Sequence, residues 1–199
     1  SAPIVAYLKK LGYIVGFNLM QAGGKADDVI ADKACQMAAW KDLDVLYFAD
    51  SLGNMDDKEV QRVVKALRTR WNGPLGIHTH NNMGKGLDNT LTAMEVGVTW
   101  LDATVTGMGR GAGNTQTECL LACLDKGQSK YKPKRIYELA IRHFEMMQKE
   151  CGWGSNLLYF LGAQNNVHPT YIQNLLSNTH YGTDEIIGAI DYLSRLEGA

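Results

Sequence analysis

Segments typical of β-strands and of α-helices alternate four times between Tyr13 and Lys126. This alternation predicts parallel strands joined by right-handed helical crossovers, in a doubly wound sheet or a closed barrel. No Gly-x-Gly-x-x-Gly turn follows the first strand, which favours the barrel. The expected strands are residues 13–19, 45–48, 75–78 and 100–105, and the helices that follow them are 26–40, 57–69, 88–96 and 115–126.

The composition of the chain changes after Lys126. A polar, basic connector at residues 128–134 precedes a second series of helix-like segments, and Pro133 marks the start of the first of them. We therefore expect two domains, a strand-containing domain at 1–127 and a helical domain at 128–199. The helices expected in the second domain are residues 135–151, 157–163, 169–176 and 183–194.

Two histidines, His78 and His80, occupy alternate positions at the carboxyl end of the third expected strand. Side chains two residues apart on a strand project to the same face, so both imidazoles are available to one divalent ion. Parallel α/β folds collect binding residues at this end of their strands. The spacing leaves three alternatives open: metal binding, acid–base catalysis without a metal, and a structural histidine pair.

Polar residues also follow the second and fourth expected strands. Asp50 and Ser51 are candidates for contact with a substrate, or for a turn or helix cap. Arg110, in the glycine-rich turn of residues 107–113, is a candidate for binding a carboxylate or phosphate of the substrate. Its alternative role is to neutralise Asp50 or Asp102, because an unpaired carboxylate is costly to bury.

Four short segments carry a family resemblance: GFNLM at 16–20, ADSLG at 49–53, HTHNN at 78–82 and GMGRGAGNT at 107–115. Their order and amino-acid sequences resemble those of the DRE-TIM metallolyases and are most similar to those of the 4-hydroxy-2-oxovalerate aldolases. The resemblance implies an α/β fold, a partial TIM barrel made of the four C-terminal β/α units and followed by a small α-helical domain.

The resemblance also implies a metal and a reaction. It implies a divalent ion, manganese first with magnesium, cobalt and zinc as alternatives, bound by His78, His80 and Asn114 with an aspartate of a first strand that this sequence does not contain. The implied reaction cleaves a 4-hydroxy-2-oxo acid to pyruvate and an aldehyde, with the ion stabilising an enolate. Tyr159 matches a tail tyrosine that assists catalysis, and a packed helix aromatic is the alternative role for it.

The absence of that first-strand motif leads us to expect an incomplete fragment that is inactive alone. A half barrel has two sheet edges and uncovered apolar surface, so we expect a homo-oligomer. The alternative functions are a 2-isopropylmalate synthase-like condensation of a 2-oxo acid with acetyl-CoA, and a catalytically inactive binding or assembly module. In the aldolases a comparable helical domain contacts a dehydrogenase that receives the aldehyde, so an aldehyde dehydrogenase is a candidate partner.

The charge and apolar content of the chain exclude several classes of partner. It has 20 basic and 21 acidic residues and a net charge of −1, which gives no reason to expect nucleic acid or an anionic membrane as partner. No apolar stretch approaches the roughly 20 residues of a membrane span. The four cysteines show no disulfide framework and the first residues show no signal-peptide pattern, so we expect a cytoplasmic protein.

Overall fold

The computed structural model describes residues 1–125, 131–178 and 180–197, which group into two compact units. The first, here the strand unit, contains residues 1–51, 55–78 and 88–102. The second, here the helical unit, contains residues 52–54, 79–87 and the chain from 103 onward. The predicted domain boundary at 127/128 and part of the predicted basic connector lie outside the described residues.

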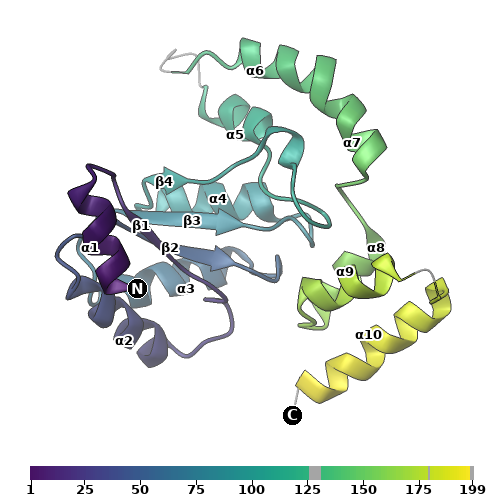
Figure 1. The fold of residues 1–199 in the computed structure, drawn as a ribbon, viewed down its shortest axis with the longest axis horizontal. Helices are drawn as coiled ribbons and strands as arrows, with labels where there is room; N and C mark the ends of the chain where they lie inside the picture. Colours follow the sequence, from purple (N-terminus) through teal and green to yellow (C-terminus); the bar gives the residue numbers. More distant parts are fainter. Residues whose placement is uncertain (126–130, 179, 198–199) are drawn as a thin grey trace. The chain divides into compact units, whose positions relative to one another are not determined.

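The strand unit is built on a parallel sheet (Figure 1). Gly16 of β1 pairs with Val45 of β2, and Gly76 of β3 pairs with Trp100 of β4, both in parallel register. Spatial order equals sequence order, so each crossover returns the chain to the neighbouring strand, as in a barrel. The strands in the described part of the chain are β1 (Gly16–Leu19), β2 (Val45–Asp50), β3 (Leu75–Thr79) and β4 (Trp100–Leu101).

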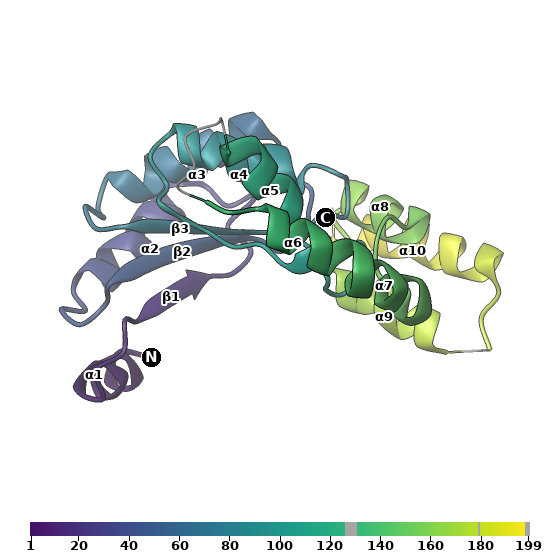
Figure 2. The ribbon, with the colours of Figure 1, turned by 90° about the horizontal axis from the view of Figure 1, so that it is seen from above.

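Three crossover helices pack against one face of this sheet. Figure 2 shows α3 and α4 on the same side of the strands. Leu46 and Phe48 of β2 and Ile77 of β3 are buried in the core with residues of the helices. Because side chains alternate along a strand, Tyr47 and His78 lie on the opposite face. The helices are α2 (Asp27–Ala38), α3 (Asp57–Arg68) and α4 (Gly86–Glu95).

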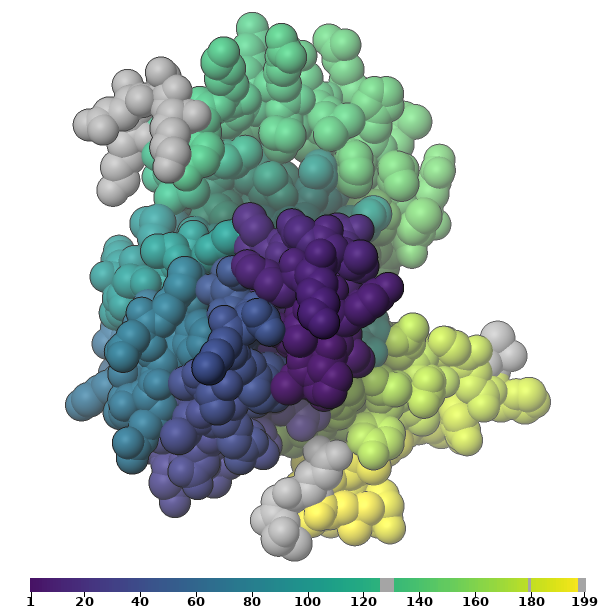
Figure 3. All heavy atoms as spheres, turned by 60° about the vertical axis from the view of Figure 1, so that its left-hand side comes forward, coloured from purple at the N-terminus to yellow at the C-terminus, as the bar shows by residue number. Residues whose placement is uncertain are grey.

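The N-terminal helix α1 (Ala2–Lys10), drawn in purple, lies on the surface (Figure 3). Lys9 forms an ion pair of 2.5 Å with Asp44, whose other carboxylate oxygen accepts the backbone N–H of Val15 at 2.8 Å. These bonds lower the pKa of the Asp44 carboxyl, with the hydrogen bond from Lys9 as the largest cause. The carboxylate therefore links α1 to the residue that precedes β1.

One hydrophobic core of the helical unit is shared by α8, α9 and α10. It contains Tyr159, Ile172 and Ile190. No described helix is long and apolar enough to cross a membrane. The elements of this unit are η1 (a 3-10 turn, Val105–Gly107), α5 (Thr117–Leu124), α6 (Lys134–Leu139), η2 (a π-helical turn, Ala140–Phe144), α7 (Glu145–Cys151), α8 (Leu157–Gln164), α9 (Pro169–Ser177) and α10 (Thr183–Glu197).

Most element boundaries lie within a few residues of the predicted ones, and the differences at β1, β4 and the predicted helix 135–151 have identifiable structural features. β1 begins at Gly16 instead of Tyr13, because Tyr13 and Ile14 are exposed and lie outside the ladder. β4 ends after Leu101, because the backbone N–H of Thr104 bonds instead to the carbonyl of Thr115 at 3.0 Å. The predicted helix 135–151 is observed as α6, η2 and α7 in succession, with a π-helical turn in the middle.

Candidate active site

His78 lies on the face of the sheet opposite the helices. Its Nδ1 is 3.2 Å from the carboxylate oxygen Oδ2 of Asp102. The side chains are 27% and 44% exposed. The contact follows from strand register, because Ile77 pairs with Leu101 and the next pair along would join His78 to Asp102.

Tyr47 approaches the same carboxylate from β2. Its hydroxyl forms a hydrogen bond with Asp102, and its ring lies against Gly76, where a Cβ atom would be 2.4 Å from Cε1. Burial, followed by the charge of Asp102 and this hydrogen bond, raises the pKa of Tyr47 to about 12. The hydroxyl is therefore protonated at neutral pH and acts as a donor.

Tyr47 is not among the site residues predicted from the sequence. Two signals were available in the sequence. Alternation along β2 places Tyr47 opposite Leu46 and Phe48, and Gly76 on the next strand leaves space for a large ring. The sequence does not show the strand register, which places Asp102 beside both Tyr47 and His78.

His80 and Asn114 are brought together within the helical unit. They form an isolated antiparallel bridge, and the neighbouring Asn81 N–H donates to the Gly113 carbonyl at 2.8 Å. The Asn114 amide donates through Nδ2 to the Met108 carbonyl at 3.2 Å. Its Oδ1 is buried and has no hydrogen-bond partner among the described residues. A buried acceptor without a donor is uncommon and is a candidate ligand atom.

The glycine-rich turn positions Asn114. Gly113 has a φ of +80°, and a Cβ atom there would lie 2.0 Å from the Gly107 carbonyl oxygen. Only glycine permits this approach of backbone to backbone, which lets the Asn114 N–H donate to that carbonyl at 3.0 Å. Next to it, the hydroxyls of Thr79 and Thr115 are 2.6 Å apart and buried.

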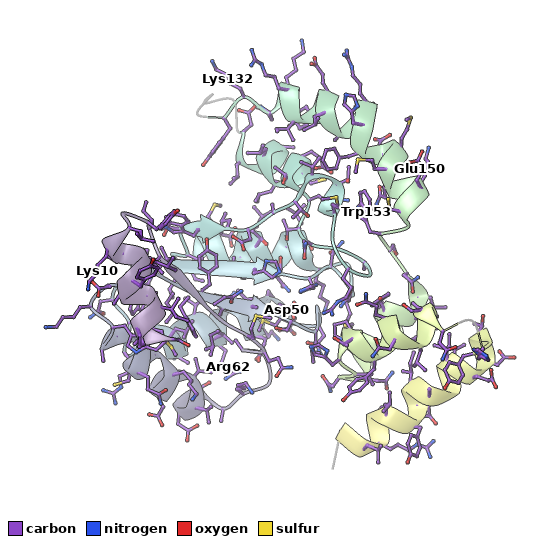
Figure 4. All side chains as sticks on the ribbon, in the orientation of Figure 1. Lys10, Asp50, Arg62, Lys132, Glu150 and Trp153 are labelled. Carbon is purple, nitrogen blue, oxygen red and sulfur yellow. The ribbon has the colours of Figure 1, made fainter. Side chains whose placement is uncertain are left out.

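Asp50 and Ser51 support the turn that follows β2. Asp50, labelled in Figure 4, is 1% exposed and its carboxylate accepts the Met55 N–H at 3.3 Å. It lies two residues beyond Phe48 and hence on the side that faces the helices. The Ser51 hydroxyl accepts the N–H of Gln21 at 2.9 Å. These contacts support the turn role that the sequence left open beside substrate binding.

Arg110 and Tyr159 make contacts inside the helical unit. Arg110 donates to the Thr170 hydroxyl at 3.0 Å. Tyr159 is 7% exposed, and burial raises its pKa. Its ring packs so closely on Gly111 that a Cβ atom there would be 2.6 Å from Cδ1. This environment supports the packed-aromatic role that was the alternative to catalysis.

The described residues contain no group of three or more His, Cys, Asp or Glu side chains placed to hold a metal ion. The candidate ligands are instead two histidines and an amide. The cysteines are free, and Cys35, Cys123 and Cys151 are exposed.

A model of the HMGL-like family matches residues 1–142, more than half of the sequence. The chain belongs to the HMGL-like family. The match includes the β/α units, the two histidines and the glycine-rich turn. The family resemblance predicted from the four motifs is confirmed.

Several curated relatives of this HMGL-like chain carry the name 4-hydroxy-2-oxovalerate aldolase. The one from Brevibacillus brevis is 40% identical over 126 residues, 63% of this chain and 37% of its own length. The one from Bacillus thuringiensis is 33% identical over 168 residues, 82% of this chain and 49% of its own length. This chain thus spans less than half of the length of either relative.

Solved structures show the same fold. The N-terminal domain of a Bacteroides vulgatus protein proposed to be an aldolase superposes with a TM-score of 0.78 and 32% identity, covering 94% of this chain and 62% of that one. The HMG-CoA lyase of Brucella melitensis has a TM-score of 0.65 at 18% identity, covering 74% of this chain and 57% of that one, and shows the fold alone. The prediction of an α/β fold with a parallel four-stranded sheet of the barrel type is confirmed.

Proposed function

We propose that this chain supplies part of the active site of a divalent-metal-dependent aldolase that cleaves a 4-hydroxy-2-oxo acid to pyruvate and an aldehyde. Membership of the HMGL-like family and the names of relatives at 33% and 40% identity support the reaction class. Because the chain spans 37% and 49% of those relatives, we assign the activity to a larger assembly and expect the isolated chain to be inactive.

The observation that carries the metal proposal is the buried Oδ1 of Asn114, which lacks a hydrogen-bond partner among the described residues. Asn114 forms a bridge with His80, and His80 follows His78 by two positions, with the buried Thr79 between them. Two imidazoles and one amide oxygen form a mixed donor set that suits ions between the hard and the soft extremes. We propose that these three side chains bind the ion, with manganese first and magnesium, cobalt and zinc as alternatives.

An ion held by His78, His80 and Asn114 would supply Lewis acidity toward a bound 2-oxo acid. Cleavage breaks the C3–C4 bond, leaves its electron pair on C3, removes the proton of the 4-hydroxyl and delivers a proton to C3. Within this chain, Asp102 contacts His78, and the bridge with Asn114 fixes the backbone at His80. Ser51 and Arg110 remain candidates for contact with the substrate, and Tyr159 for the proton transfer.

A chimera tests the proposal. We would fuse the N-terminal half of the Brevibacillus brevis relative to this chain and supply Mn²⁺ and a 4-hydroxy-2-oxo acid. We expect pyruvate release, measured by reduction with lactate dehydrogenase, and loss of that release in the chimera with His78→Ala. The chain without the fused half is the control and should release none.

Two results would contradict this function. Release of CoA thiol from acetyl-CoA and a 2-oxo acid, without pyruvate release, would favour the synthase-like alternative. A folded, metal-loaded chimera that turns over neither substrate would favour a binding or assembly module.

A further inference from the structure

Side chains from three neighbouring strands meet on the sheet face opposite the helices. Tyr47 comes from β2, His78 from β3, and Asp102 immediately follows β4. The Asp102 carboxylate is within hydrogen-bond distance of His78 Nδ1, at 3.2 Å, and forms a hydrogen bond with the Tyr47 hydroxyl. All three residues belong to the strand unit.

We propose that Asp102 is a positioning residue that fixes the ring of His78, and that Tyr47 holds the Asp102 carboxylate in the required orientation. The proposal rests on the proposed function, in which His78 is a metal ligand. A neutral imidazole has one N–H and one lone pair, so an N–H donated from Nδ1 to the carboxylate places the lone pair on Nε2. Carboxylate partners of this kind orient metal-binding histidines and raise their basicity.

The glycines beside Tyr47 explain how a tyrosine reaches this carboxylate. A Cβ atom on Gly76 would lie 2.4 to 2.5 Å from three ring atoms of Tyr47, and one on Gly16 would lie 3.3 Å from the ring. The ring therefore lies flat across positions where its neighbours have no side chain. Packing restricts the rotation of the ring, and its hydroxyl is presented to Asp102 as a fixed donor.

A purely structural role for the cluster makes a different prediction. Asp102 is 44% exposed, and exposed pairs of this kind contribute little to stability. If the contact served stability alone, replacing Asp102 would change the unfolding free energy slightly and would leave the tautomer of His78 unchanged. A positioning role instead predicts a change of tautomer in a protein that remains folded.

The first experiment measures that tautomer in the metal-free 199-residue chain. Long-range ¹H–¹⁵N correlation spectra are recorded above the usual pKa of histidine, with the His78 signals assigned by their absence in His78→Gln. We expect the Nδ1–H tautomer in the wild type. Asp102→Ala should convert it to Nε2–H or to a mixture of the two forms. Wild-type protein in the Nε2–H form, or Asp102→Ala protein unchanged from Nδ1–H, would overturn the proposal.

The second experiment measures Mn²⁺ affinity by calorimetry. We expect Asp102→Ala to weaken binding about 10-fold to 100-fold. Tyr47→Phe keeps the ring that covers Gly76 and removes only the hydroxyl, so its loss should be smaller than that of Asp102→Ala and still measurable. Asp32→Ala, which removes an exposed carboxylate from α2, is the matched control and should bind like the wild type. Equal affinity in wild type and Asp102→Ala would overturn the proposal.

The two experiments separate this proposal from the proposed function. Wild-type protein that binds no Mn²⁺ in the full chain or in the chimera would contradict the metal site, and the tautomer measurement would still decide whether Asp102 positions His78. Circular dichroism checks that each variant is folded. If Asp102→Ala does not fold, Tyr47→Phe provides the test through the Mn²⁺ affinity, because the proposal requires a measurable loss there and an affinity equal to that of the wild type would overturn it.

Discussion

At the scale of single residues, the ionisation of Tyr47 reports on its surroundings. Burial and Asp102 raise its pKa from the usual 10 to about 12. Because the folded pKa lies above the unfolded one, the hydroxyl stabilises the folded state fully below pH 10, and this contribution is lost as the pH rises from 10 to about 12. Absorbance titration of tyrosinate should therefore show a component with a midpoint near pH 12 that Tyr47→Phe removes.

The variant Asp102→Ala separates the two causes of that shift. It should lower the Tyr47 midpoint without returning it to 10, because burial is the larger cause and remains. If Tyr47→Phe instead removes a component with a midpoint near the usual pH 10, Tyr47 is not buried as described.

Some of the residues in the site follow from the sequence and others do not. His78 and His80 are recognisable because a two-residue spacing places both on one face of a strand. Asn114 was identified through the family resemblance alone. The link between Tyr47 and Asp102 depends on strand register, which brings together residues 55 positions apart. The signs of it in the sequence are strand alternation and the glycines, Gly76 and Gly16, beside the ring.

At the scale of elements, the N-terminal cap of α3 is expected to stabilise that helix. Asp56 precedes the helix and its carboxylate accepts the Glu59 N–H at 2.9 Å. We expect Asp56→Ala to lower the unfolding free energy by about 1 kcal/mol in urea titrations. Asp57→Ala, at the next position inside the first turn, is the control and should cost less, because it removes only the favourable interaction with the helix dipole. Equal losses would argue against the cap.

The glycine-rich turn and α8 offer a second test. Gly111→Ala combines a φ of +64° with a Cβ atom 2.6 Å from the Tyr159 ring. Gly12→Ala has a φ of +86° and nothing within 4 Å, so it isolates the backbone cost of about 1 kcal/mol. We expect thermal unfolding to show a clearly larger loss for Gly111→Ala. Similar losses of thermal stability in the two variants would mean that the Tyr159 ring moves away from the added Cβ atom at no cost in free energy.

The bounds of α3 were predicted more closely than those of β1 and β4, because helical periodicity and a cap are local signals. The expected helix 57–69 is observed as α3 (Asp57–Arg68), with its cap at the residue before it. The ends of β1 and β4 depend on hydrogen bonds to distant segments, so apolar residues alone suggested longer strands. The π-helical turn η2 carries no distinctive residue that would have revealed it.

At the scale of the whole molecule, we propose that copies of this chain associate. Within the described residues, β1 and β4 are the edges of the sheet, and Ile14, just before β1, is 70% exposed. We expect light scattering to give a mass that rises with protein concentration, and Ile14→Asp to reduce that rise. Val29→Asp, on the exposed part of α2, is the control. A constant monomer mass would contradict the proposal.

The grouping of residues into units was only partly accessible from the sequence. The alternation of strands and helices predicts the strand unit well. The helical unit, however, also includes the loops at residues 52–54 and 79–87, which follow β2 and β3. Their placement arises from contacts such as the hydrogen bond that the Asn54 side-chain amide donates to the Ala163 carbonyl at 3.1 Å. No local sequence pattern predicts such a contact.

The most direct test of the metal site is calorimetric titration of the 199-residue chain with Mn²⁺, with and without oxalate as a mimic of pyruvate enolate. We predict binding that oxalate tightens, that Asn114→Ala weakens and that the double variant His78→Ala/His80→Ala abolishes. Binding of equal strength in the wild type and the double variant would contradict the account and would leave His78 and His80 as structural residues.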